Sequence, residues 1–119
     1  MNTAATSREA QTASERIIEA VSAWPGVRVG PNSRGALAFM VGRREIGHLH
    51  GNHSFHTSFP KALWGELKGQ GRIVDHPVFP GRAGPAARRI ESDGDVTDVI
   101  ALMRLNYDRM VASAPPAAA

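Results

Sequence analysis

The apolar positions of the chain fall into two different periods. Near both ends of the chain they recur every three to four residues, which is typical of amphipathic helices. Between residues 27 and 50 they form short runs separated by glycine-rich or charged turns, which favours strands. The pattern therefore predicts helices at both ends and a group of strands after the first helix.

The first helix is expected from about residue 8 or 13 to residue 23. Thr12 and Glu15 have the spacing of a capping box, in which each side chain bonds the other residue's backbone N–H. Pro25 disfavours helical geometry at the residue before it, so the helix should end there.

Two further helices are expected. Phe59 and Pro60 open the second, where the missing N–H of proline costs nothing, and Gly69 ends it. Ser92 is a good N-cap for the last helix, and acidic residues follow in its positive first turn. Its apolar stripe consists of Val96, Val99, Ile100, Met103 and Tyr107.

Strands are expected over 27–29, 36–41 and 45–50 as a meander, followed by an extended segment over 72–79 and a strand over 87–91. The order α-β-β-β-α-β-β-α predicts an α+β fold, with helices packed on one face of an antiparallel or mixed sheet. The predicted core is Ile17, Val21, Trp24, Leu37, Phe39, Val41, Ile46, Leu63, Leu67, Ile90, Val96, Val99, Ile100 and Met103.

The length of 119 residues suits one domain, expected over 8–112. Residues 1–7 and 113–119 are small and polar or proline-rich, so they are expected to be disordered. The chain has no cysteine, which excludes disulfides and thiolate chemistry. No apolar stretch is long enough for a membrane span and the start does not resemble a signal peptide, so a cytoplasmic protein is expected.

The net charge is +3, from 14 basic and 11 acidic residues. The arginines are spread along the chain, and only Arg43-Arg44 and Arg88-Arg89 are adjacent pairs. Without a basic run or interleaved aromatic residues, no nucleic-acid partner is expected. A small-molecule ligand and a homodimer remain as candidate partners.

Four of the five histidines lie between His48 and His56. On the predicted strand, Ile46, His48 and His50 share one face, because side chains alternate with period two. Two imidazoles in this arrangement can share a metal ion. A third ligand would come from His53, His56, His76 or Asp75.

Three interpretations of this cluster stay open. The histidines could hold a metal, they could face solvent as the polar end of a hairpin, or they could act without metal in acid–base chemistry or ligand orientation. If the segment 72–79 runs beside the strand 45–50, His76 approaches His48 and His50. Imidazoles so placed repel one another when charged, so at least one should have a lowered pKa.

The catalytic candidates are therefore His48, His50 and His76, and the metal candidates are His48 and His50. The ligand-binding candidates are Arg44, His53, His56 and Arg89. Arg43-Arg44-Glu45 could bind an anion, although a charged turn that protects a sheet edge explains it as well. No flavin, nucleotide or serine-hydrolase motif occurs, so the cofactor is unknown.

The run from Phe39 to His50, FMVGRREIGHLH, resembles the core motif of small bacterial proteins called luciferase domain or luciferase family proteins. Further matches follow in order at Phe59-Pro60, Gly71-Arg72, His76, Ile90 and Tyr107, so the resemblance covers about residues 14 to 111.

The resemblance implies a shared domain with a histidine centre at His48, His50 and His76. It also implies similarity to the luciferase of luminous fungi, an oxygenase that adds O2 to a hispidin-type pyrone. Where the family is expected to have an aspartate before the second helix, this chain has His56. Two functions are therefore expected as alternatives. One is a small-molecule binding domain, and the other is a cofactor-independent or metal-assisted oxygenase-like enzyme acting on an aromatic or enolisable substrate.

Overall fold

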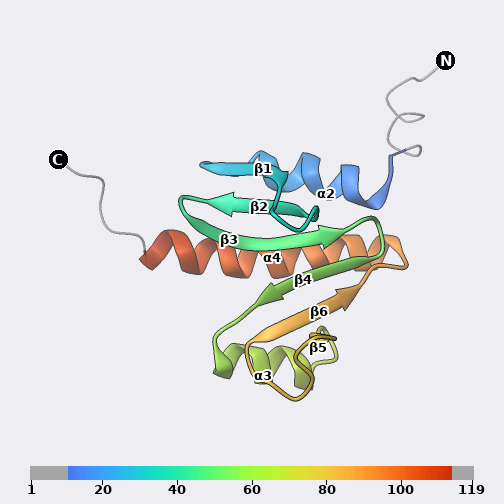
Figure 1. Ribbon diagram of the computed structural model, residues 1–119, viewed down its shortest axis with the longest axis vertical. Coiled ribbons are helices and arrows are strands. Elements are labelled where there is room, and N and C mark those ends of the chain that lie inside the picture. Colours follow the sequence, from blue (N-terminus) through green and yellow to red (C-terminus); the bar gives the residue numbers. More distant parts are fainter. Residues whose placement is uncertain (1–10, 114–119) are drawn as a thin grey trace.

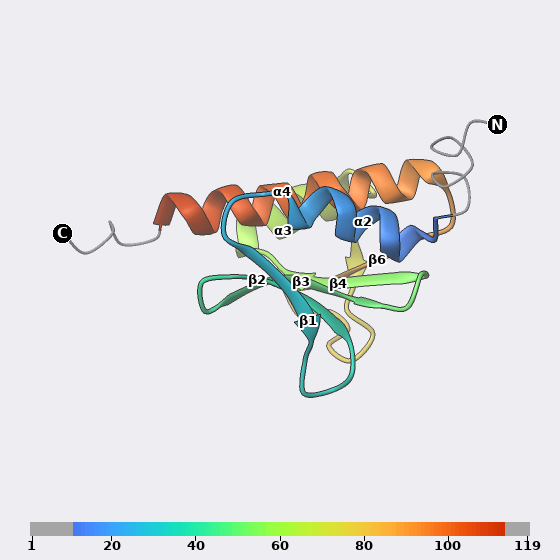
Figure 2. The ribbon, with the colours of Figure 1, turned by 90° about the horizontal axis from the view of Figure 1, so that it is seen from above.

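The computed structural model describes residues 11–113, in which three helices lie on one face of a six-stranded antiparallel sheet (Figures 1 and 2). The α+β fold is as predicted from the sequence. In chain order the elements are α2 (Ala13–Ser22), β1 (Val27–Pro31), β2 (Leu37–Val41), β3 (Arg44–His50), β4 (Ser54–Ser58), α3 (Lys61–Gly69), β5 (Val74–Asp75), β6 (Pro85–Arg89) and α4 (Asp93–Ser113).

The strands lie in the order β1-β2-β3-β4-β6-β5. Strand β4 was not predicted, because it contains a single large apolar residue, Phe55, between polar ones. It follows β3 as a hairpin whose turn contains Gly51 at φ +61°, a left-handed conformation that glycine adopts without cost. The segment 72–79 does not run beside β3, the condition on which the approach of His76 to His48 and His50 was predicted, because its strand β5 pairs with β6 at the edge of the sheet.

The predicted helix signals are confirmed at both ends of the domain. Thr12 and Glu15 form the capping box of α2, and the Ser92 hydroxyl accepts a hydrogen bond from the Asp95 N–H in the first turn of α4. Helix α4 is longer than expected and includes Ser113, which had been assigned to the disordered tail. The other residues of the two predicted tails, 1–7 and 114–119, lie outside the described part of the chain.

A β-bulge in β3 decides which side chains face the core. Phe39 of β2 pairs with Gly47, whereas the next residue, Met40, pairs with Glu45, so Ile46 is the extra residue. Ile46 is fully buried in the core. The prediction that it shares a face with His48 and His50 was therefore wrong, because a bulge interrupts the alternation of side chains.

Beyond the His48–His56 pair the ladder between β3 and β4 stops, and β4 continues beside β6 alone. Figure 1 shows the two strands diverging from their common turn. The Thr57 hydroxyl donates to the Ile46 carbonyl at 2.7 Å. The Asn106 amide of α4 reaches the Ile46 carbonyl at 3.2 Å and the Ser58 carbonyl at 3.1 Å. These side chains supply the donors that a paired strand would have supplied.

The core lies between the sheet and the helices. Nine of the predicted core residues are buried, and Trp24, Leu37, Val41, Leu63 and Ile100 pack against them while partly exposed. The predicted core omitted buried large residues of β4, of the segments before α3 and β5, and of α4. These are Phe55, Phe59, Ile73, Leu102, Tyr107 and Met110, together with Leu49 of β3.

Ion pairs connect helix α4 to β6 and to the segment before β5. Asp98 binds Arg72 and Arg88, and Asp95 binds Arg88 as well. Hydrogen bonding from Arg88 lowers the pKa of Asp95. At Asp98 burial raises the pKa, but the hydrogen bonds and charges of Arg72 and Arg88 outweigh burial, so the pKa of Asp98 is also lowered. These pairs therefore stabilise the fold above about pH 4 and lose that contribution as the pH falls further.

No helix within residues 11–113 combines the length and the apolar character that a membrane crossing requires.

We expect Gly47→Ala to destabilise the protein by about 1–3 kcal/mol through overpacking. A Cβ at this position would lie 2.3 Å from Cε1 of Phe55, a ring that is fully buried and cannot swing away. Gly65→Ala in α3 is the matched control, since its Cβ meets nothing within 4 Å. Urea unfolding measures both, and equal stability of the two variants would contradict the packing described for the bulge.

We expect Asn106→Leu to cost roughly 1–3 kcal/mol, because it removes a donor from buried carbonyl groups at similar side-chain volume. The exposed Asp108 of the same helix provides a control, and Asp108→Leu should stay within about 0.5 kcal/mol of the wild type. Thermal unfolding by circular dichroism checks the difference. An Asn106→Leu variant as stable as the control would show that the hydrogen bonds of Asn106 to the carbonyl groups between β3 and β4 do not stabilise the fold.

Candidate functional site

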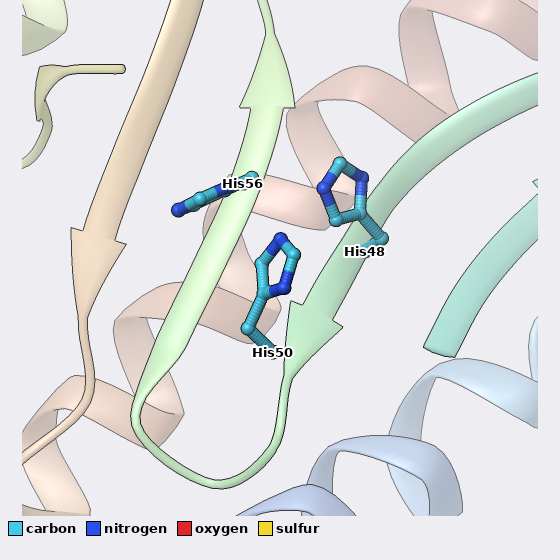
Figure 3. A group of neighbouring side chains, drawn as sticks. All are labelled: His48, His50 and His56. Carbon is cyan, nitrogen blue, oxygen red and sulfur yellow. The ribbon is translucent and has the colours of Figure 1, made fainter. Parts of the chain in front are cut away.

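Three histidines converge on the face of the sheet away from α4 (Figure 3). His48 and His50 come from β3 and His56 comes from β4. One ring nitrogen of each lies within 4.8 Å of the others. The ring centroids are 4.9 Å apart for His48 and His50, and 4.4 Å apart for His50 and His56.

The register of the hairpin places these side chains together. His48 pairs directly with His56, and directly paired residues of an antiparallel ladder project to the same face. The outer neighbours in the same row are small, since Ala38 pairs with His48 and Ala87 pairs with His56. Small flanking side chains leave the space above the row to the imidazoles.

Glu45 orients the ring of His48. Its carboxylate accepts a hydrogen bond from His48 Nδ1 at 3.0 Å, which leaves Nε2 of this ring free. In a regular strand residues three apart lie on opposite faces. The bulge at Ile46 is what brings Glu45 to the same face as His48. In metal sites, the histidine nitrogen that does not bind the metal usually donates a hydrogen bond to a carboxylate, a backbone carbonyl or water.

His76 joins the cluster from the loop that follows β5. Its ring centroid is 4.4 Å from that of His56, although its segment is separated from β4 by β6 in the sheet. Its Nδ1 accepts a hydrogen bond from the Val78 N–H at 3.1 Å. In the neutral ring the proton therefore resides on Nε2, so that His76 offers a hydrogen-bond donor rather than a free nitrogen lone pair.

The electrostatics of the cluster confirm the predicted repulsion between imidazoles. Burial and, in decreasing order, the charges of His76, His50 and His48 together lower the pKa of His56 to about 4. Burial and the charges of His48 and His50 also lower the pKa of His76. His56 is therefore neutral at physiological pH and its ring lone pair is available.

The cluster forms one wall of a cavity of about 900 Å³. The strands contribute Glu45, Thr57 and Ser58, and the loop between β1 and β2 contributes Asn32 to Arg34 and Ala36. Apolar side chains line another part of it, namely Phe59, Pro60, Val78, Phe79, Pro85 and Met110. A volume of this size accommodates a small organic molecule.

Two arginines line the same cavity. Arg44 stands at the start of β3 and Arg109 near the end of α4. Arg44 had been selected from the sequence, but Arg109 had not, because on α4 it looks like one of many solvated helix arginines. Only the three-dimensional fold brings it beside the bulge.

Other residues selected from the sequence lie elsewhere. His53 is exposed in the β3–β4 turn and lines a separate hollow with Asn52 and Asp93. Arg89 is exposed, with its side chain 3.9 Å from Glu91. Asp75 binds Lys68 and the Gly81 N–H, so both of its oxygens already hold the loop. None of these three residues lines the histidine cavity.

The three histidines fit a metal ion with a modest closure. A tetrahedral ion with nitrogen ligands at 2.0–2.1 Å keeps those nitrogens about 3.3 Å apart. The ring nitrogens, which lie up to 4.8 Å apart, must therefore approach one another by roughly 1.5 Å when the ion binds. Rotation of partly exposed side chains can supply this movement, since His50 is exposed and His48 and His56 are only half-buried.

A protein-family model described as "Luciferase domain" matches residues 43–106, more than half of the chain. The match begins in the β2–β3 turn, includes all four histidines of the cavity and ends at Asn106. The comparisons with curated proteins and with solved structures gave no match.

In the metal-free protein we expect His56 to titrate near pH 4, and His76→Asn to raise that pKa, because the charge of His76 is one of the causes that lower it. The lowered pKa of His56 also makes the stability of the fold depend on pH. The unfolded chain takes up the proton near pH 6.5 and the folded chain only near pH 4, so stability falls between these values as the pH falls. NMR titration of the ring protons measures the pKa, and a midpoint at the ordinary value would refute the cluster.

Proposed function

The chain belongs to the Luciferase domain family, and we propose that it binds a small organic molecule at a divalent metal ion held by His48, His50 and His56. The metal lies at the wall of the cavity, and the ligand fills the space beside it. The observation that supports this proposal most strongly is the mutual distance of 4.8 Å or less between three imidazole nitrogens that line a ligand-sized cavity.

The surroundings of the histidines favour a metal over solvent-facing side chains. His48 already donates a hydrogen bond from Nδ1 to Glu45, and metal-binding histidines usually have such a partner on the nitrogen that does not bind the metal. His56 is neutral because of burial and neighbouring charge, so no proton needs to be displaced from it. Three imidazoles placed together repel one another when protonated, whereas a shared cation turns the same arrangement into an attraction.

The donor set indicates the kind of metal and the kind of site. Imidazole nitrogens suit zinc, copper, iron and nickel rather than calcium or magnesium. Three protein ligands leave at least one coordination position open, which is typical of sites that act on a bound molecule rather than of structural sites. The ligand of the protein would occupy that position with an oxygen or nitrogen donor.

The second candidate is an oxygenase-like enzyme at the same centre. The observation that favours it is His76, whose ring lies against His56 while its Nδ1 is occupied by the Val78 N–H. His76 can therefore present Nε2–H to a bound substrate as a proton donor or hydrogen-bond donor. In this version the substrate is aromatic or enolisable, and the metal-assisted reaction takes place in the apolar part of the cavity.

We expect one zinc ion per chain in calorimetric titration of protein purified without a histidine tag. Glu45→Gln removes the hydrogen-bond partner of a metal ligand and should weaken zinc binding by roughly 10–100-fold. His56→Ala removes a ligand itself and should weaken zinc binding by more than that. His53→Ala is the matched control and should bind as the wild type does, since His53 lies outside the cavity.

Circular dichroism would establish that each variant is folded before titration. Wild-type protein that binds no zinc would refute the metal centre. So would an equal loss of affinity in the His53→Ala and His56→Ala variants, because binding would then reflect scattered surface histidines.

Nitric oxide, which binds ferrous ions at open coordination positions, tests whether the centre could bind O2 as the oxygenase requires. In the enzyme version, protein loaded with ferrous iron should give the electron paramagnetic resonance signal of a nitrosyl adduct with 1:1 stoichiometry, and the signal should be lost in His48→Ala. A ferrous centre that does not bind nitric oxide has no position for O2 and would eliminate the oxygenase.

A further inference from the structure

We infer that the ligand of this cavity is an organic carboxylate with an apolar body, and that Arg44 and Arg109 hold its carboxylate group. The inference deepens the proposed function and rests on it for the role of the histidines. The arginines that carry it are not metal ligands, so the two ideas can be tested separately.

Arg109 has an unsatisfied hydrogen-bond donor. Its Nη2 donates to Asn106 Oδ1 at 3.0 Å, but its Nε is enclosed and lacks a partner among the described residues. Buried donors are almost always bonded, and leaving one unbonded costs free energy. Because Arg109 lines the cavity, a rotation of its guanidinium group would bring Nε to an acceptor on a bound molecule.

Arg44 adds a second guanidinium to the same end of the cavity. Its Nη1 donates to the Ser113 hydroxyl at 2.9 Å, which fixes its position without neutralising its charge. Burial, and then the charge of Arg44, lowers the pKa of Arg109, so the two cations are close enough to repel. Neither forms an ion pair within residues 11–113, while Glu45 of the same cavity is bonded to His48.

A single carboxylate placed between the two arginines relieves both problems at once. It supplies the acceptor that Nε lacks and neutralises the repulsion between the guanidinium groups. The planar guanidinium fork matches the two oxygens of a carboxylate, and such charge-assisted bonds are about twice as strong as neutral ones.

The remainder of the cavity indicates an apolar ligand body rather than an inorganic anion. Val78 and Phe79 line it and are 69% and 41% exposed, although large apolar side chains usually avoid such exposure. A hydrophobic molecule in the cavity would cover them. Because of the bulge, Arg44 and His48 pair with Val41 and Ala38, three residues apart on β2, so they lie roughly 10 Å apart along the sheet. A ligand of that length reaches the metal centre with its other end.

The experiment uses the metal-free full-length chain and three probes, namely cinnamate, its neutral isostere cinnamamide and inorganic phosphate. Binding is followed by NMR at the arginine Nε–H resonances. Cinnamate should shift the Arg109 signal and bind about 10–100 times more tightly than cinnamamide, since one or two charge-assisted hydrogen bonds distinguish them. Phosphate should bind more weakly than cinnamate, because it leaves the apolar wall uncovered.

Arg109→Gln and Arg44→Gln should each abolish the preference for cinnamate over cinnamamide. Arg104→Gln is the matched control, because Arg104 lies on the same helix but contacts Trp24 and Asp108 rather than the cavity. It should keep the preference of the wild type.

Equal binding of cinnamate and cinnamamide, or loss of preference in the Arg104→Gln variant, would overturn the carboxylate site. Phosphate binding as tight as that of cinnamate would overturn the apolar body. Failure of the metal centre gives a different result. In that case zinc does not bind, yet cinnamate still binds the metal-free protein and its His48→Ala variant with the same preference.

Discussion

The parting of β3 from β4 beyond the His48–His56 pair is the constraint on which the rest of the site depends. Strands that separate expose backbone carbonyl groups, and such groups must find donors or the fold loses stability. Thr57 and Asn106 provide those donors at the Ile46 carbonyl. Helix α4 therefore closes the gap from the core side, and the opposite side of the same gap is left as a cavity.

The bulge at Ile46 determines which side chains of β3 face the cavity between the separated strands. It turns Ile46 into the core, leaves Gly47 against the ring of Phe55, and brings Glu45 onto the face of the histidines. Arg44, at the start of β3, and Arg109 of α4 line the same cavity. One local irregularity thus helps to bring a group of imidazoles and two guanidinium groups into one cavity. The apolar residues of the loop after β5 and of the segment before α3 complete its walls.

The sequence predicts the α+β class, the capping box at Thr12 and the proximity of His48 and His50, because each follows from a local pattern or a period. The approach of His76 was predicted only on the condition that segment 72–79 lies beside β3, whereas β5 pairs with β6. It does not predict β4, since residues 54–58 carry only one large apolar side chain and resemble a polar loop. His56 was therefore assigned a secondary role, although it lies at the centre of the cluster. The bulge has no signature in the spacing of residues, and Arg109 acquires its neighbours only through the packing of α4. These features depend on contacts between segments far apart in the chain.

Crystallography of zinc-soaked protein with anomalous diffraction at the zinc edge tests the central claim most directly, because it locates the ion without reference to activity. We expect one strong anomalous peak between the rings of His48, His50 and His56, with metal–nitrogen distances of about 2.0–2.1 Å. It also predicts that Glu45 stays bonded to His48. A peak at His53 or at the Asp75–Lys68 pair, with the histidine cluster empty, would contradict the account.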